Sequence, residues 1–160
     1  MIGNEKNFQQ ALKLIEESGV VEMDIYPSNV SLIPVYQLLP YWIQVGGLEV
    51  MLNKLLNNHI AERVIKELAI FKRGDLMVAK APGNEFLVDK SISDLAKNSG
   101  MTIPEYLLHL MVTTRLRVLV FYKNINFDLL KELLNHPGTL ISSNNSLIKI
   151  SPFLKFLEIV

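Results

Sequence analysis

The 160-residue sequence contains no cysteine. Disulfides, thiolate nucleophiles, thiolate zinc sites and cysteine-ligated iron–sulfur clusters all need that residue, so its absence excludes them. The three histidines (His59, His109 and His136) stand far apart and outside any H-E-x-x-H pattern, so the sequence predicts no metal site. It also lacks a glycine-rich phosphate loop and a G-x-S-x-G nucleophile motif. We therefore expect no cofactor and no enzyme, unless distant groups such as Asp24, Glu49, Asp75 or a histidine converge on folding.

Charged residues are also scarce, at 20%, whereas hydrophobic residues make up 49%. This composition is far from that of disordered chains and is apolar for a soluble monomer. We expect some apolar surface to contact a protein partner or a second copy. The first residues, Met1 to Lys6, lack the basic and apolar regions of a signal peptide, which favours a cytoplasmic location.

The charges are unevenly distributed although they sum to zero. Up to residue 53 two basic residues accompany six acidic ones, a net charge of −4, and residues 54–123 hold eleven basic and seven acidic ones, a net charge of +4. Three interpretations stay open: the acidic first third attracts the basic middle region within one chain, the basic middle region attracts an anion, or the charges form an ordinary solvated surface.

Residues 25–48 carry no charge at all. The run is long enough to raise the question of a membrane span, but Pro27, Pro34, Pro40 and the pair Gly46-Gly47 interrupt it. Its aromatic residues also lie in the middle rather than at the ends. We predict no membrane span but a short, proline-bounded helix over residues 35–43, buried or packed on another chain. The candidate partner-binding residues here are Tyr36, Tyr41 and Trp42.

Hydrophobic periodicity and turn residues predict an α+β fold, helix-rich, with a helix–turn–helix and small antiparallel hairpins. We expect one domain, residues 1–160, in which residues 1–73 are helical and residues 74–160 mix helices with hairpins. The predicted helices cover residues 4–18, 48–58, 59–73 and 126–134, in addition to the helix pair at 91–114. The predicted strands cover 21–26 and 116–121, with hairpins at 76–80/85–90 and 139–142/147–150, whereas 153–160 is ambiguous.

The helix pair at residues 91–114 has the clearest boundaries. Ser91 with Asp94, and Thr102 with Glu105, both match the capping-box pattern, and Gly100 separates the two helices. The second helix is apolar and adds Tyr106 as a candidate partner-binding residue, which favours protein contacts. The alternative is that the chain is an accessory subunit of a nucleic-acid-processing complex and binds RNA or DNA through its basic middle region. Its candidate contacts are Lys72, Arg73, Lys97, Asn98, Arg115 and Arg117.

The segment SISDLAKNSGMTIPEYLLHLMVTTRLRV resembles the core of small prokaryotic antitoxins encoded beside PIN-domain nucleases. The matching positions include Ser91, Ala96, Gly100, Met101 and Glu105, and VIKELAIFKRGDL is similar to the helix that precedes this motif. The sequence departs from the family by the inserted segment MVAKAPGNEFLVDK, and the resemblance covers about a quarter of the chain. It implies a regulator that binds a nuclease partner and operator DNA.

Overall fold

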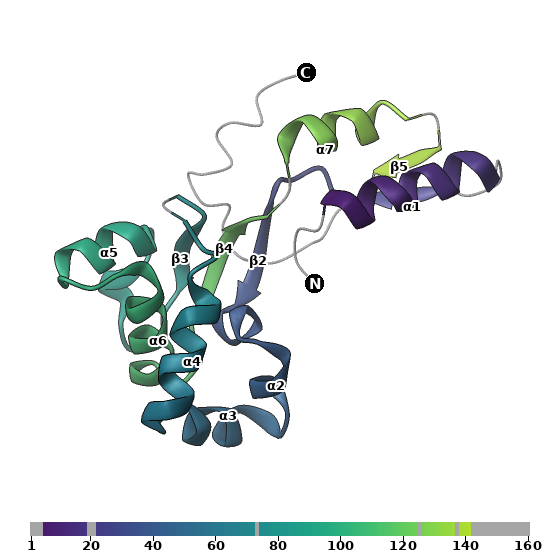
Figure 1. The fold of residues 1–160 in the computed structure, drawn as a ribbon. Coiled ribbons are helices and arrows are strands. Elements are labelled where there is room, and N and C mark those ends of the chain that lie inside the picture. Colours follow the sequence, from purple (N-terminus) through teal and green to yellow (C-terminus); the bar gives the residue numbers. More distant parts are fainter. Residues whose placement is uncertain (1–4, 19–21, 73, 125, 137, 142–160) are drawn as a thin grey trace. The chain divides into compact units, whose positions relative to one another are not determined.

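The computed structural model describes residues 5–18, 22–72, 74–124, 126–136 and 138–141 (Figure 1). The fold is α+β, as predicted. The chain forms two compact units, residues 32–123 and residues 1–31 with 124–160. These boundaries fall at residues 31 and 123 rather than at 73, and whether the whole chain is one folding domain stays a prediction. Among the described residues, no helix is long and apolar enough to cross a membrane.

The unit of residues 32–123 holds most of the helices. Two predicted helices form as α3 (Gly47–Leu55) and α4 (Asn58–Leu68), and the predicted pair forms as α5 (Ile92–Asn98) and α6 (Ile103–Thr113). The helix predicted over 59–73 ends at Leu68, because Phe71 turns inward and meets Tyr122 edge-on at 5.5 Å between ring centroids. The helix predicted over 35–43 is divided by Pro40 into the 3₁₀ turn η1 (Val35–Leu38) and α2 (Tyr41–Gln44).

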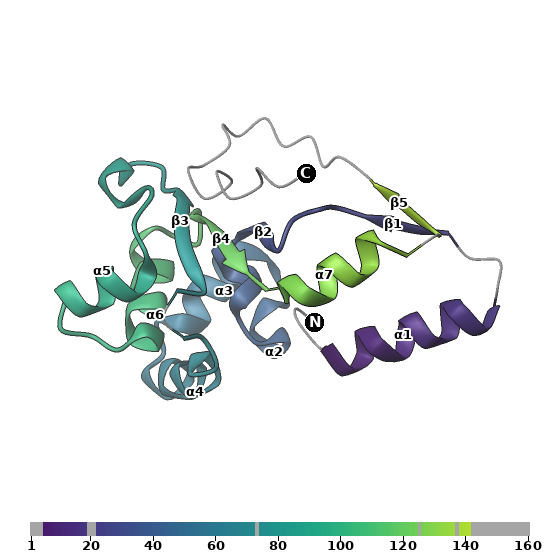
Figure 2. The same ribbon diagram turned by 90° about the horizontal axis from the view of Figure 1, so that it is seen from above.

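A three-stranded sheet of order β2-β4-β3 lies beside these helices (Figures 1 and 2). Its strands are β2 (Val30–Pro34), β3 (Leu76–Lys80) and β4 (Leu119–Lys123). Of the predicted hairpin between 76–80 and 85–90, the first strand is confirmed as β3 and the second strand is wrong. Residues 85–87 form the 3₁₀ turn η2 (Glu85–Leu87), and β3 instead pairs antiparallel with the distant β4, where Val78 faces Val120. Part of the expected pairing is present: Val78 donates its amide to the carbonyl of Lys90 at 3.0 Å and accepts from the amide of Asp89 at 2.9 Å, and Met77 forms an isolated bridge with Ser91.

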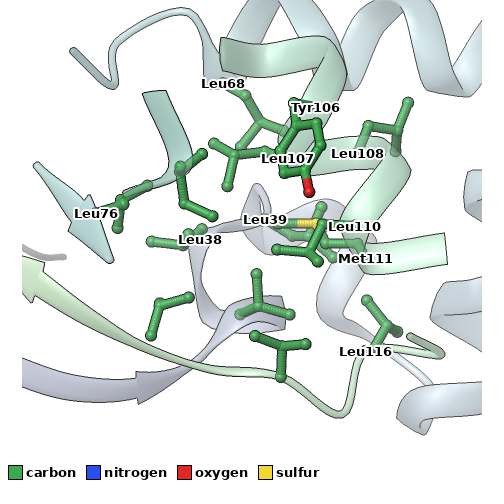
Figure 3. Close-up of a cluster of buried hydrophobic side chains, with 14 of the residues drawn as sticks. Leu38, Leu39, Leu68, Leu76, Tyr106, Leu107, Leu108, Leu110, Met111 and Leu116 are labelled. Atoms are coloured by element: carbon green, nitrogen blue, oxygen red, sulfur yellow. The ribbon is translucent and has the colours of Figure 1, made fainter. Parts of the chain in front are cut away.

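The hydrophobic core of this unit is built around α6. Figure 3 shows side chains of α6, among them Leu107, Leu110 and Met111, in a cluster with Leu38, Leu39 and Leu76. Val78 of β3, Val120 of β4 and Val118, just before β4, are fully buried. Core side chains of this size each gain about 1.5–3 kcal/mol from leaving water, so this cluster is what holds the unit together.

The second unit contains α1 (Glu5–Ser18), β1 (Met23–Ile25), α7 (Phe127–Leu134) and β5 (Thr139–Ile141). All four were predicted, with small differences at their ends. The strand pairing was not predicted: β5 runs parallel to β1, with Asp24 opposite Leu140. The expected partner of β5 in a hairpin, residues 147–150, lies outside the described residues, as does the ambiguous segment 153–160.

Two consecutive glycines produce the bend between α2 and α3. Gly46 has a φ of +105° and Gly47 a φ of +83°, a region that side chains with a Cβ enter only at a cost. A Cβ added at Gly46 would also lie 2.9 Å from Cγ1 of Val50, whereas one added at Gly47 would meet nothing within 4 Å. Both positions are therefore conformationally restricted, and only Gly46 is sterically restricted as well.

We predict that Gly46→Ala lowers the free energy of unfolding by about 2–3 kcal/mol, from backbone strain plus the overlap with Val50. In Gly47→Ala only the backbone strain arises, so we expect the free energy of unfolding to fall by about 1–2 kcal/mol. Chemical denaturation of both variants measures the difference. Equal losses would contradict the contact between position 46 and Val50.

Candidate functional site

The second helix of the predicted helix–turn–helix is a core helix. Tyr106, Leu107, Leu110 and Met111 of α6 are buried, and the outward-facing side chains include Glu105, His109 and Thr113. A helix that reads a DNA groove presents hydrogen-bonding and cationic side chains to it. These three outward positions carry one carboxylate and no Lys or Arg. Tyr106, predicted as a partner contact, is only 6% exposed, so that prediction is wrong.

The structure shows why Tyr106 turns inward. Thr102 and Glu105 form the predicted capping box: the amide and hydroxyl of Thr102 each donate to Oε2 of Glu105 at 2.7 Å, and the Glu105 amide donates to the Thr102 hydroxyl. The box fixes Glu105 toward solvent, so the next residue faces the core. These hydrogen bonds also hold the pKa of Glu105 below its usual 4.5, with the Thr102 hydroxyl as the main cause. At the other predicted box, Ser91 accepts from the amide of Ser93.

The candidate nucleic-acid contacts come from several different elements. Lys97 and Asn98 are exposed at the end of α5, Lys72 is exposed before β3, and Arg117 is exposed before β4. Arg115 is exposed too, but its guanidinium is paired with Glu49. Arg73 lies outside the described residues. No hydrogen bond or ion pair between described residues joins these cations into one site.

The carboxylates considered for catalysis have separate structural roles. Glu49 accepts from Arg115, and Asp75 accepts from the backbone amide of Lys72 at 2.8 Å. Within the described part of the chain, no group of three or more histidine and carboxylate side chains is placed to hold a metal ion.

The most exposed aromatic residue of the charge-free run is Tyr41, on α2. Its side chain is 84% exposed, and three neighbours along the bend are exposed as well: Val45 (58%), Leu48 (41%) and Val50 (44%). We call these four residues the elbow surface. The other two predicted aromatic contacts, Tyr36 and Trp42, are partly buried and pack against the core. The glycine pair at the bend is the sequence signal that could have identified Val45, Leu48 and Val50, because these residues lie around the bend. In the sequence, the two glycines indicated only an interruption of the charge-free run 25–48.

Side-chain hydrogen bonds to the backbone hold the elbow in shape. Lys54, from α3, donates its ammonium to the carbonyls of Ile43 at 3.4 Å and Val45 at 3.1 Å. Gln44 donates its side-chain amide to the carbonyl of Leu39 at 2.6 Å. The bonds from Lys54 satisfy carbonyl groups at the end of α2, which have no partner within so short a helix, and the bond from Gln44 satisfies a carbonyl that precedes α2.

Trp42 fastens α2 to α4. Its indole Nε1 donates to Oε1 of Glu67 at 3.0 Å, and the guanidinium carbon of Arg63 lies 4.2 Å from the ring centroid. Arg63 and Glu67 are themselves paired at 3.3 Å, one helical turn apart. The three side chains form a closed set of contacts that fixes the position of the α2 backbone.

An ion pair borders the elbow surface. The Arg115 guanidinium donates to both carboxylate oxygens of Glu49, at 3.0 and 3.1 Å, and both side chains remain more than half exposed. Arg115 (φ +50°) and Leu116 (φ +62°) both adopt the left-handed conformation, which is rare for residues other than glycine. The amide of Leu116 closes this turn on the carbonyl of Met111 at 2.8 Å, and its side chain is buried.

Comparison of the chain with protein-family models, with curated proteins and with solved structures found no match. The resemblance to antitoxins therefore stays a prediction.

The capping box gives a pH-dependent prediction. The pKa of Glu105 is lowered in the folded state, so its contribution to stability is present above pH 4.5 and is lost as the pH falls through the lowered folded value. We expect wild type to be more stable than Glu105→Gln at pH 6 and the two to converge near pH 3, as denaturant unfolding at the two pH values would measure. A difference independent of pH would contradict the carboxylate's role. In Thr102→Val, the NMR-measured pKa of Glu105 should rise toward 4.5.

The contacts of Trp42 give a second prediction, because Trp42 is the chain's single tryptophan and its fluorescence reports on α2 alone. Arg63→Ala removes the cation above the ring, so we expect greater quenching by acrylamide and a loss of stability of about 0.5–1 kcal/mol. Lys66→Ala, an exposed change on the same helix, is the matched control. If both variants quench alike, the contact between Arg63 and Trp42 is not present in solution.

Proposed function

We propose that this chain is a non-enzymatic, cytoplasmic binding protein that docks a protein partner through the elbow surface. The observation that carries the proposal is the exposure of four apolar residues, Tyr41, Val45, Leu48 and Val50, within ten positions around a bend that hydrogen bonds hold in place. Tyrosine is enriched among residues that dominate binding energy, and aliphatic neighbours exclude water around it. A surface that is ordered before binding also loses little conformational entropy when the partner arrives.

Other strongly exposed apolar residues of this unit are Leu56, Ile70 and Phe86, which are 61%, 71% and 68% exposed. Phe86 has the Lys90 ammonium over its ring at 5.9 Å, and Ile70 lies between the end of α4 and the exposed Lys72. Single exposed apolar residues are normal on protein surfaces. The elbow surface differs because it gathers four such residues within ten positions of the chain, none of them charged.

A protein partner is favoured over nucleic acid. Nucleic-acid binding depends on cations that track the phosphate backbone, and the elbow surface has none. The antitoxin-like aspect of the proposal rests on the resemblance of residues 91–118. Since α6 from that segment is buried, a regulator of that type would engage its partner through the elbow surface rather than through the second helix of the pair.

We expect a photo-crosslinking amino acid at position 41 to form protein adducts in living cells, because this position lies at the centre of the proposed contact. Position 70 is the matched control, since Ile70 is 71% exposed but outside the elbow surface. Gel electrophoresis with mass spectrometry detects the adducts. The proposal is contradicted if position 41 forms no adduct, if positions 41 and 70 form the same adducts, or if the adducts at 41 are removed by nuclease.

A further inference from the structure

We draw no further inference here: the strongest candidate, the exposed apolar side chains of Leu140 and Ile141 on strand β5 of the two-stranded sheet, carries nothing because nothing among the described residues shows what covers them.

Discussion

The burial of α6 is the constraint on which the rest of the structure depends. Its apolar side chains pack where α6 meets α3, α4 and α5, and they belong to the same hydrophobic cluster as Leu76 of β3. Each fully buried leucine or methionine contributes about 1.5–3 kcal/mol, far more than any surface contact in the unit. The outward face of α6, with Glu105, His109 and Thr113, offers no Lys or Arg to a groove in DNA. The helix pair that looks most like a recognition motif in the sequence is therefore the structural centre of the unit.

The α2–α3 bend carries four of the exposed apolar residues of this unit, Tyr41, Val45, Leu48 and Val50. Turning the chain there exposes backbone carbonyls, and Lys54 and Gln44 satisfy those of Ile43, Val45 and Leu39. Because polar atoms near the bend already have partners inside the chain, a protein that covers the elbow surface need not replace those bonds. The free energy of binding then comes mainly from removing apolar side chains from water.

Local signals in the sequence were sufficient for the helices and insufficient for the pairing of strands. The spacing of apolar residues located α4, although it ends at Leu68 rather than at 73, and the caps at Thr102 and Asn126 located α6 and α7. In contrast, β3 pairs with β4 about forty positions away, and β1 lies parallel to β5 across more than a hundred. The strand β2 was missed altogether, since proline and serine interrupt its alternation. For the site, Tyr41 was found from the charge-free run, but no local pattern separated it from the buried Tyr106.

The turn after α6 shows that the ion pair bordering the elbow surface is not explained by stability. A left-handed conformation costs about 1–2 kcal/mol at a residue other than glycine, and Arg115 and Leu116 both adopt it. Burial of the Leu116 side chain offsets the cost at that position. Arg115 has no such compensation, because its side chain is exposed and a surface ion pair contributes only about 0.2–1 kcal/mol. Glycine at this position would form the same turn without strain. What the arginine adds is a guanidinium bonded to both carboxylate oxygens of Glu49, and in the proposed function a charged pair beside the apolar residues would favour one orientation of the bound partner.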